Sequence, residues 1–170
     1  YHASSHYMGK LLRAGFKIAI ADQMEDPAAA KGIVRREVTR VMTPGTVVED
    51  ELLDARTANY LAAVELDSVG WGLSCVEVST GEFWAAQALN DRDHAQLESL
   101  LAKLGPAEVL ACDKAGAPLK RCRELAPRAT WTLRPDPAPM ELTIPEGWDN
   151  PELWRNRPLA LRAALKVRRY

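Results

Sequence analysis

The stretch that decides the organisation of this chain is residues 33–46, IVRREVTRVMTPGT. Residues 33–42 are rich in β-branched and basic side chains, a pattern that predicts a basic β-strand. The pair Pro44-Gly45 then ends the strand, because proline donates no backbone N–H and glycine is free to adopt positive φ. Acidic residues follow at 49–51. We therefore interpret the stretch as the last strand of one unit and the hinge into the next.

The basic strand carries three arginines, Arg35, Arg36 and Arg40, and they are spread over both of its faces because alternate residues point to opposite sides. A strand with three guanidinium groups is seldom buried on both faces. Two interpretations stay open at this point. The strand is either a solvated edge strand whose arginines extend into water, or a strand that presents its guanidinium groups to phosphate.

Length and composition predict an ordinary globular protein of one or two domains, with 170 residues of which 47% are hydrophobic. No run approaches the roughly 18–20 apolar residues of a membrane span. Nothing at the start resembles a signal peptide, and the opening Tyr1-His2-Ala3 leads us to expect an excised fragment of a longer chain. We expect a protein of the cytoplasm with no membrane partner.

The cysteine pattern favours a reducing compartment. Cys75, Cys112 and Cys122 are widely spaced and odd in number. Two of them stand in apolar, strand-like surroundings. We therefore predict buried free thiols, and neither a disulfide nor a metal site.

A net charge of −1 conceals three blocks of different sign. Residues 1–46 carry 7 basic and 4 acidic side chains, residues 47–113 carry 3 and 13, and residues 114–170 carry 12 and 6. An acidic block repels nucleic acid, so any contact with DNA should come from the two flanking blocks.

The first unit has few elements. Residues 2–15 read as a helix, 16–21 as a short strand, and Asp26-Pro27 as the start of a short helix closed by Gly32, before the basic strand. About 46 residues is near the lower limit for an independent domain. The first unit is therefore predicted to be the end of a larger domain, and residues 47–57 a linker with a charged helical turn at 49–56.

The second unit, residues 58–170, alternates strands and helices. Short turns join three strands into a meander, and two helices then alternate with two further strands, which predicts an α/β fold with a mixed sheet and helices on its faces. The order βββαβαβ is that of ribonuclease H-like folds. Six prolines between 135 and 158 predict an irregular crossing segment, followed by a last helix at 158–167. The predicted strands are 59–66, 71–78, 82–89, 107–112 and 130–133, and the first two helices are 91–104 and the segment around 119–125.

Several strings of residues together resemble the MutS family of DNA mismatch repair proteins. They are YHA at 1–3, ADQMEDPAAAKGIVRREVTRVMTPGTVVEDELLDARTANYLAAV at 21–64, and GWGLSCVEVSTGEFWAA at 70–86. The resemblance covers residues 1–113 closely and the rest loosely. It implies that residues 1–46 are the C-terminal part of the mismatch-recognition domain, a partial mixed α/β domain. Residues 58–170 would then be a truncated, ribonuclease H-like connector domain.

The resemblance also implies partners and cofactors. In this family the protein binds mismatched double-stranded DNA, and the connector relays DNA binding to the ATPase domains and docks MutL. ATP and Mg²⁺ belong to the ATPase domain, and homodimers form through other domains; we expect both to lie outside this fragment. The sequence has neither the family's Phe-x-Glu mismatch wedge nor a G-x-x-x-x-G-K-[ST] phosphate loop. The fragment is therefore predicted to be no enzyme and to hold no cofactor.

What remains for this chain is contact with the DNA backbone, for which Arg35, Arg36, Arg40 and the helix start at His2 are the candidates. For His2 itself, and for His6, a position in solvent or at the edge of the core is the simpler interpretation. His94 has no second ligand at metal-binding spacing and is predicted to lie on the surface.

Two alternatives are weighed against this prediction. A ribonuclease H-like fold admits a Mg²⁺-dependent nuclease, but Glu65, Asp67, Glu77 and Asp113 match its carboxylate pattern poorly and are better explained as rim carboxylates. A protein-docking module would use the strand tryptophans Trp71 and Trp84, although tryptophan in a strand more often belongs to the core.

Overall fold

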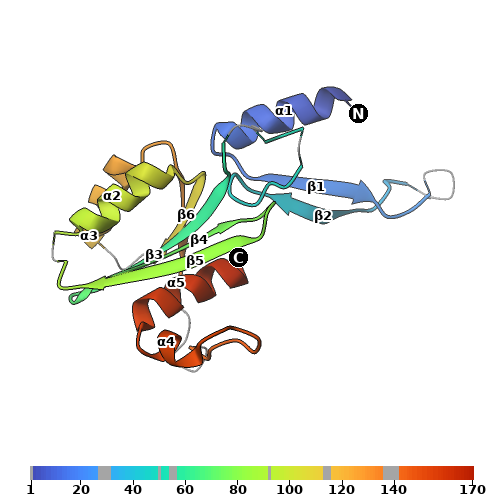
Figure 1. Cartoon of the computed structure of the whole chain (residues 1–170). Helices are drawn as coiled ribbons and strands as arrows, with labels where there is room; N and C mark the ends of the chain where they lie inside the picture. Colours follow the sequence, from blue (N-terminus) through green and yellow to red (C-terminus); the bar gives the residue numbers. More distant parts are fainter. Residues whose placement is uncertain are drawn as a thin grey trace.

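Within the residues that it describes, a computed structural model of the chain contains two separate sheets, one of two strands and one of five (Figure 1). The structure describes residues 2–26, 32–49, 51–53, 57–91, 93–112, 116–135 and 142–170.

The described part of the first unit consists of one helix and a two-stranded antiparallel sheet. Helix α1 is followed by strand β1, which pairs with β2 and begins two residues later than predicted. The register shifts between Ile20 and Ala21, where β2 carries one extra residue. The short helix predicted from Asp26 falls on residues 27–31, which lie outside the described residues. The elements are α1 (His2–Arg13), β1 (Ile18–Gln23) and β2 (Arg36–Met42).

The second unit is a five-stranded mixed sheet in the order β5-β4-β3-β6-β7. The pairs β5·β4 and β4·β3 are antiparallel, whereas β3·β6 and β6·β7 are parallel. The predicted mixed sheet and its element order are confirmed. The strands are β3 (Tyr60–Leu66), β4 (Gly70–Glu77), β5 (Glu82–Leu89), β6 (Glu108–Cys112) and β7 (Thr130–Arg134).

Helices cover both faces of the five-stranded sheet (Figure 1). Alternate residues of β3 face opposite sides: Ala62 and Val64 belong to the core beneath α2 and α3, and Leu61 and Ala63 to the core beneath α5. Helix α4 stands where an irregular segment was predicted. The helices are α2 (Ala95–Leu104), α3 (Gly116–Leu125), α4 (Pro151–Arg155) and α5 (Pro158–Arg169).

Helix α5 lies unusually close to the sheet. A Cβ atom added at Gly72 of β4 would stand 2.2 Å from the carbonyl carbon and oxygen of Leu159. The side chain of Gln87 on β5 accepts the backbone N–H groups of Leu159 and Ala160 at 2.9 and 3.3 Å. It thereby caps the first turn of α5, whose own preceding residue makes no side-chain cap.

Candidate nucleic-acid interface and its junction with the second sheet

Strands β1 and β2 form an arm that projects from the rest of the molecule (Figure 1). Residues 36–41 of β2 are all exposed, and only Met42 at the strand's end is buried. A two-stranded ribbon whose faces both meet water has to carry polar and charged side chains. The strand is therefore solvated, which agrees with both interpretations of its arginines.

The structure brings the three candidate arginines together on this arm. Arg36 is exposed and stands opposite Gln23 in the register. Arg35 makes an ion pair with Glu37 at 3.3 Å, and both side chains are more than half exposed. The third arginine, Arg40, makes an ion pair with Glu49 of the linker.

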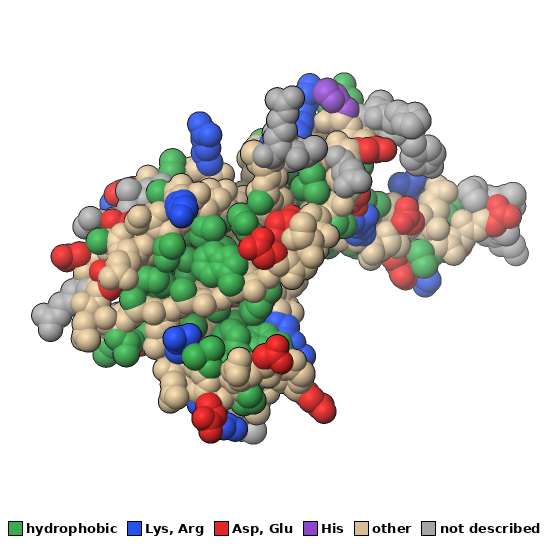
Figure 2. Space-filling view, in the orientation of Figure 1, with side chains coloured by type: hydrophobic (Ala, Val, Ile, Leu, Met, Phe, Trp, Pro, Cys, Tyr) green, Lys and Arg blue, Asp and Glu red, His purple; other side chains and the backbone are tan. Residues whose placement is uncertain are grey.

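The arm carries charges of both signs (Figure 2). Across the two strands the hydroxyl of Thr39 donates to the carboxylate of Asp22 at 2.5 Å. An exposed ion pair contributes little to stability, so the arginines are available to exchange a carboxylate partner for a phosphate. Helix α1 begins at His2, whose side chain lies outside the described residues.

The corner after β2 is buried, and it lies against the second sheet. Thr43, Pro44 and Gly45 all lie inside the molecule. Gly45 does not adopt positive φ, so the predicted reason for a glycine here is wrong. A Cβ at this position would instead stand 2.8 Å from the Cβ of Glu108 and 3.0 Å from Leu61. Glycine is required because the corner approaches the second sheet so closely.

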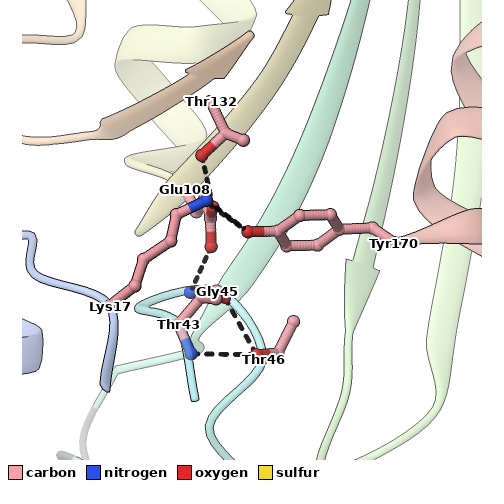
Figure 3. Close-up of polar contacts among 7 residues, drawn as sticks. All are labelled: Lys17, Thr43, Gly45, Thr46, Glu108, Thr132 and Tyr170. Carbon is pink, nitrogen blue, oxygen red and sulfur yellow. Dashed lines mark hydrogen bonds and ion pairs between the residues drawn. The ribbon is translucent and has the colours of Figure 1, made fainter. Parts of the chain in front are cut away.

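Glu108, the first residue of β6, contacts the corner through its side-chain carboxylate (Figure 3). One carboxylate oxygen accepts the backbone N–H of Gly45 at 3.2 Å. The other accepts the hydroxyls of Thr132 and Tyr170, both at 2.6 Å. The ammonium group of Lys17 lies 3.5 Å from this second oxygen. A fully buried carboxylate thus has its lone pairs satisfied from four separate segments.

The pKa of Glu108 reflects two opposing effects. Burial acts to raise it, but hydrogen bonds from Thr132, Thr43, Tyr170 and the Gly45 amide outweigh that effect, and the pKa lies below the ordinary glutamate value. The side chain is therefore an anion at neutral pH, and the positive charge of Lys17 at the rim partly balances it.

The described carboxylates that were considered for a nuclease have other partners, and the interpretation of Glu65 and Glu77 as rim carboxylates is wrong because both are buried. Glu65 is buried in an ion pair with Lys166 of α5. Glu77 accepts hydrogen bonds from Ser79 and Thr80 at the opposite end of the β3·β4 pair. Asp67 binds the backbone of the turn between these strands. Among the described residues no three His, Cys, Asp or Glu side chains form a metal-binding group, and Asp113 lies outside them.

The tryptophans belong to the core, as their strand positions indicated. Trp71 is 2% exposed and its indole N–H donates to Asp91 at 2.7 Å, while Trp84 is half-buried against the same core. Asp91 also accepts the backbone N–H of Gln96. Because Asp91 is held in this way, α2 begins only at Ala95 and not at residue 91 as predicted.

The cysteines and the two remaining histidines differ in how far they are buried. Cys75, Cys112 and Cys122 are buried, as predicted, and no disulfide joins them. His6 is exposed and stacks edge-on against Tyr7. His94 is half-buried rather than on the open surface, and it is the residue before α2, with a φ of 54°.

Sequence reasoning missed Glu108. The available signal was a single charge at the head of an otherwise apolar strand, EVLAC, all five residues of which are buried. A charge inside such a run has to be paired or hydrogen-bonded, so it marks a polar contact that the local sequence does not otherwise show.

Two α/β units meet at this buried corner, one with a basic arm and one with a mixed sheet. Comparison with known proteins identifies both. The family model described as MutS domain I matches residues 1–51, and that of MutS domain II, the connector domain, matches residues 59–170. The chain therefore belongs to the MutS family.

Three relatives, each named DNA mismatch repair protein MutS, show the extent of the similarity. The protein of Synechococcus sp. is 45% identical over 158 residues, which cover 85% of this chain and 17% of the relative. That of Methanothrix thermoacetophila is 51% identical over 111 residues, which cover 65% of this chain and 12% of the relative. That of Syntrophomonas wolfei is 44% identical over 110 residues, which cover 65% of this chain and 13% of the relative. The chain thus spans less than a fifth of the length of these relatives.

Among the described residues, no helix combines the length and the apolar character needed to cross a lipid bilayer.

Proposed function

We propose that this chain serves a MutS-type mismatch repair protein by holding the DNA backbone with its basic arm and by carrying the connector. The observation that supports this most is the exposed arm, which places Arg35, Arg36 and Arg40 on one ribbon in a chain of the MutS family. The relatives' name states mismatch repair, and binding of mismatched DNA is carried over to this chain as part of the proposal.

The arm is suited to phosphate and not to base reading. Guanidinium groups bind phosphate oxygens in a bidentate manner, and such contacts position a protein on a duplex without reading its sequence. No aromatic wedge accompanies these arginines in the sequence of β1 or β2. Binding by the arm should therefore be equal for matched and mismatched duplexes and should weaken steeply with salt.

Fluorescence anisotropy with a labelled duplex tests the backbone contact. Replacing Arg36 with Gln should weaken binding of matched and mismatched duplexes equally and reduce the slope of log K against log salt by about 1. Arg155→Gln is the matched control, since Arg155 is exposed on α4, away from the arm. Equal effects of the two substitutions would contradict a specific role of the arm.

Glu49 offers a second test of the same contact. Its carboxylate occupies Arg40 in the DNA-free chain, so a phosphate has to displace it. Glu49→Gln should therefore strengthen binding at low salt, about twofold to fivefold, because the competing charge is removed. Weaker binding by this variant would indicate that the pair holds Arg40 in place for DNA.

The second unit is proposed to act as the connector between DNA binding and the remaining domains, and as the docking surface for MutL. Crosslinking of MutL to this chain, mapped by mass spectrometry, should yield links within residues 59–170. Links confined to residues 1–51 would contradict this assignment.

The proposal includes no catalytic step in this chain. ATP and Mg²⁺ are assigned to an ATPase domain elsewhere in the parent protein, as are the contacts that form homodimers, and the parent protein is placed in the bacterial cytoplasm. The purified chain should neither hydrolyse ATP nor cut DNA in the presence of Mg²⁺. Cleavage that requires Glu65 or Glu77 would restore the nuclease alternative.

A further inference from the structure

The arm joins the rest of the molecule at two points, Lys17 before β1 and Gly45 after β2, which we call its roots. Both contact the carboxylate of Glu108. Lys17 directly precedes β1, and Gly45 follows β2 by three residues. Each lies at Glu108, Lys17 through its ammonium group at 3.5 Å and Gly45 through its backbone N–H at 3.2 Å (Figure 3). A ribbon held at only one root can swing about it, whereas a ribbon held at both has a fixed direction.

The anchor itself is rigid. Glu108 begins β6, which pairs with β3 on one side and β7 on the other, so its backbone is held inside the sheet. The hydroxyl of Thr132 on β7 fixes the carboxylate's orientation. With both oxygens hydrogen-bonded and no exposed surface, the carboxylate is held in one position.

The same carboxylate also holds the end of α5. The Tyr170 hydroxyl donates to Glu108 at 2.6 Å and accepts from the Lys17 ammonium at 2.8 Å. Two cations lie near its ring, with the Lys17 nitrogen 5.2 Å and the Arg134 guanidinium carbon 4.8 Å from the centroid. The residue that follows the last helix is thus bound directly to the root of β1.

We propose that Glu108 is a positioning residue that sets the direction in which the arm leaves the second sheet, and that it joins this direction to the end of α5. The consequence for DNA rests on the proposed function. An arm of fixed direction meets the duplex without the entropic cost of being ordered on binding, so its affinity depends on a residue that touches no DNA.

Distance measurement tests the positioning directly. Spin labels at Gln23→Cys on β1 and Ser99→Cys on α2 report the separation of arm and second sheet by pulsed electron paramagnetic resonance. The three native cysteines are buried and should not take up the label. Glu108→Gln removes the charge with little change in shape, and should broaden the distance distribution about twofold or more as the arm gains freedom.

Glu77→Gln is the matched control. Glu77 is also a buried carboxylate with several hydrogen-bond donors, but its partners Ser79 and Thr80 lie in the turn between β4 and β5 and not at the arm. A general loss of stability would affect both variants alike. Positioning requires that only Glu108→Gln broadens the distribution, and equal distributions in the two variants overturn it.

Two milder variants keep the test decisive if Glu108→Gln fails to fold. Tyr170→Phe removes one donor to Glu108 and the hydrogen bond from Lys17, and Thr132→Val removes the other hydroxyl; each leaves the charge of Glu108 in place. Both should broaden the distribution, Tyr170→Phe more strongly because it also releases the root of β1. Unchanged distributions in both would refute the proposal.

DNA binding separates this inference from the proposed function. The variants that broaden the distribution should lose about threefold to tenfold in affinity, with the salt slope unchanged because the arginines remain. If the unaltered chain shows no salt-dependent DNA binding, the proposed function fails, and the distance measurement still decides whether Glu108 positions the arm.

Discussion

Replacing Gly72 with Ala should displace α5 and destabilise the second unit by about 3 kcal/mol. The new Cβ would stand 2.2 Å from the Leu159 carbonyl group and 2.7 Å from the Ala160 nitrogen, where ordinary contact begins at 3.4 Å. These are backbone atoms of the first turn of α5, so no side-chain rotation relieves the overlap. The helix has to move by about 1.2 Å, the difference between 2.2 and 3.4 Å.

The magnitude follows from two effects of that movement. Overpacking of a core typically costs about 1–3 kcal/mol, and here the neighbour that has to give is a helix backbone. The shift also lengthens the hydrogen bonds by which Gln87 caps α5, and loss of a cap costs about 1 kcal/mol. For a chain of this size, 3 kcal/mol corresponds to a fall of about 6–12 °C in Tm.

Urea unfolding, followed by circular dichroism and tryptophan fluorescence, measures the effect. Gly81→Ala is the control, because Gly81 has a φ of +75° and nothing within 4 Å of the added Cβ. It should cost only the backbone strain of about 1–2 kcal/mol. A loss at Gly72 below 1 kcal/mol, or no larger than that at Gly81, would refute the close packing of α5 on β4.

Three further predictions concern the junction, its charges and the cysteines. Gly45→Ala should cost about 1–3 kcal/mol in urea unfolding and speed amide exchange around the corner, because its Cβ would stand 2.8 Å from the Cβ of Glu108; unchanged exchange would argue against the corner's contact. The pKa values of Glu108 and Glu77 both lie below the ordinary 4.5. The stabilisation that these carboxylates give is therefore present above pH 4.5 and lost as the pH falls through their lower folded values, so unfolding at pH 3 should need less urea than at pH 6; equal midpoints would contradict the hydrogen bonding described. Burial raises the pKa of Cys75 to about 12, so iodoacetamide at pH 8 should modify it only in urea, and mass spectrometry of the folded chain would reveal any error.

The sequence pattern predicted the elements whose bounds are set by neighbouring residues in the chain. Alternation and turn residues located β3, β4 and β5 to within one residue, because each strand is bounded by a short turn that restricts its length. Helix α2 was placed correctly at its end, where Gly105 adopts the left-handed conformation, but not at its start. There the tertiary contact of Asp91 with the Trp71 indole overrides the helical pattern.

The site was less predictable because it is made by contacts between distant segments. The arginines of β2 were found because a charged strand stands out in the sequence, and the structure places them on an exposed ribbon. The role of Gly45 depends on the approach of a strand 63 residues away, and no local signal distinguishes that requirement from a turn glycine. The same holds for Tyr170, whose partners Lys17 and Glu108 lie 153 and 62 residues away.

The three charge blocks of the sequence do not correspond to three charged surfaces of the folded chain. Residues 47–113 carry 13 acidic side chains, but Glu65, Glu77 and Glu108 are buried and do not face an approaching polyanion. Glu65 and Glu108 take their cations, Lys166 and Lys17, from the two basic flanks. The blocks therefore compensate each other partly inside the molecule.

Under the proposed function, DNA would meet the charges that stay uncompensated on the arm, and there Glu49 of the linker neutralises Arg40. Arg36 stands exposed beside the Arg35–Glu37 pair, whereas Arg40 is held by Glu49. If net charge governed binding, neutralising any exposed arginine would weaken it equally. If the arm governs binding, Arg36→Gln weakens it and Arg155→Gln does not, so the contrast between these two substitutions distinguishes contact by the arm from a general effect of net charge. Glu49→Gln should strengthen binding in either case.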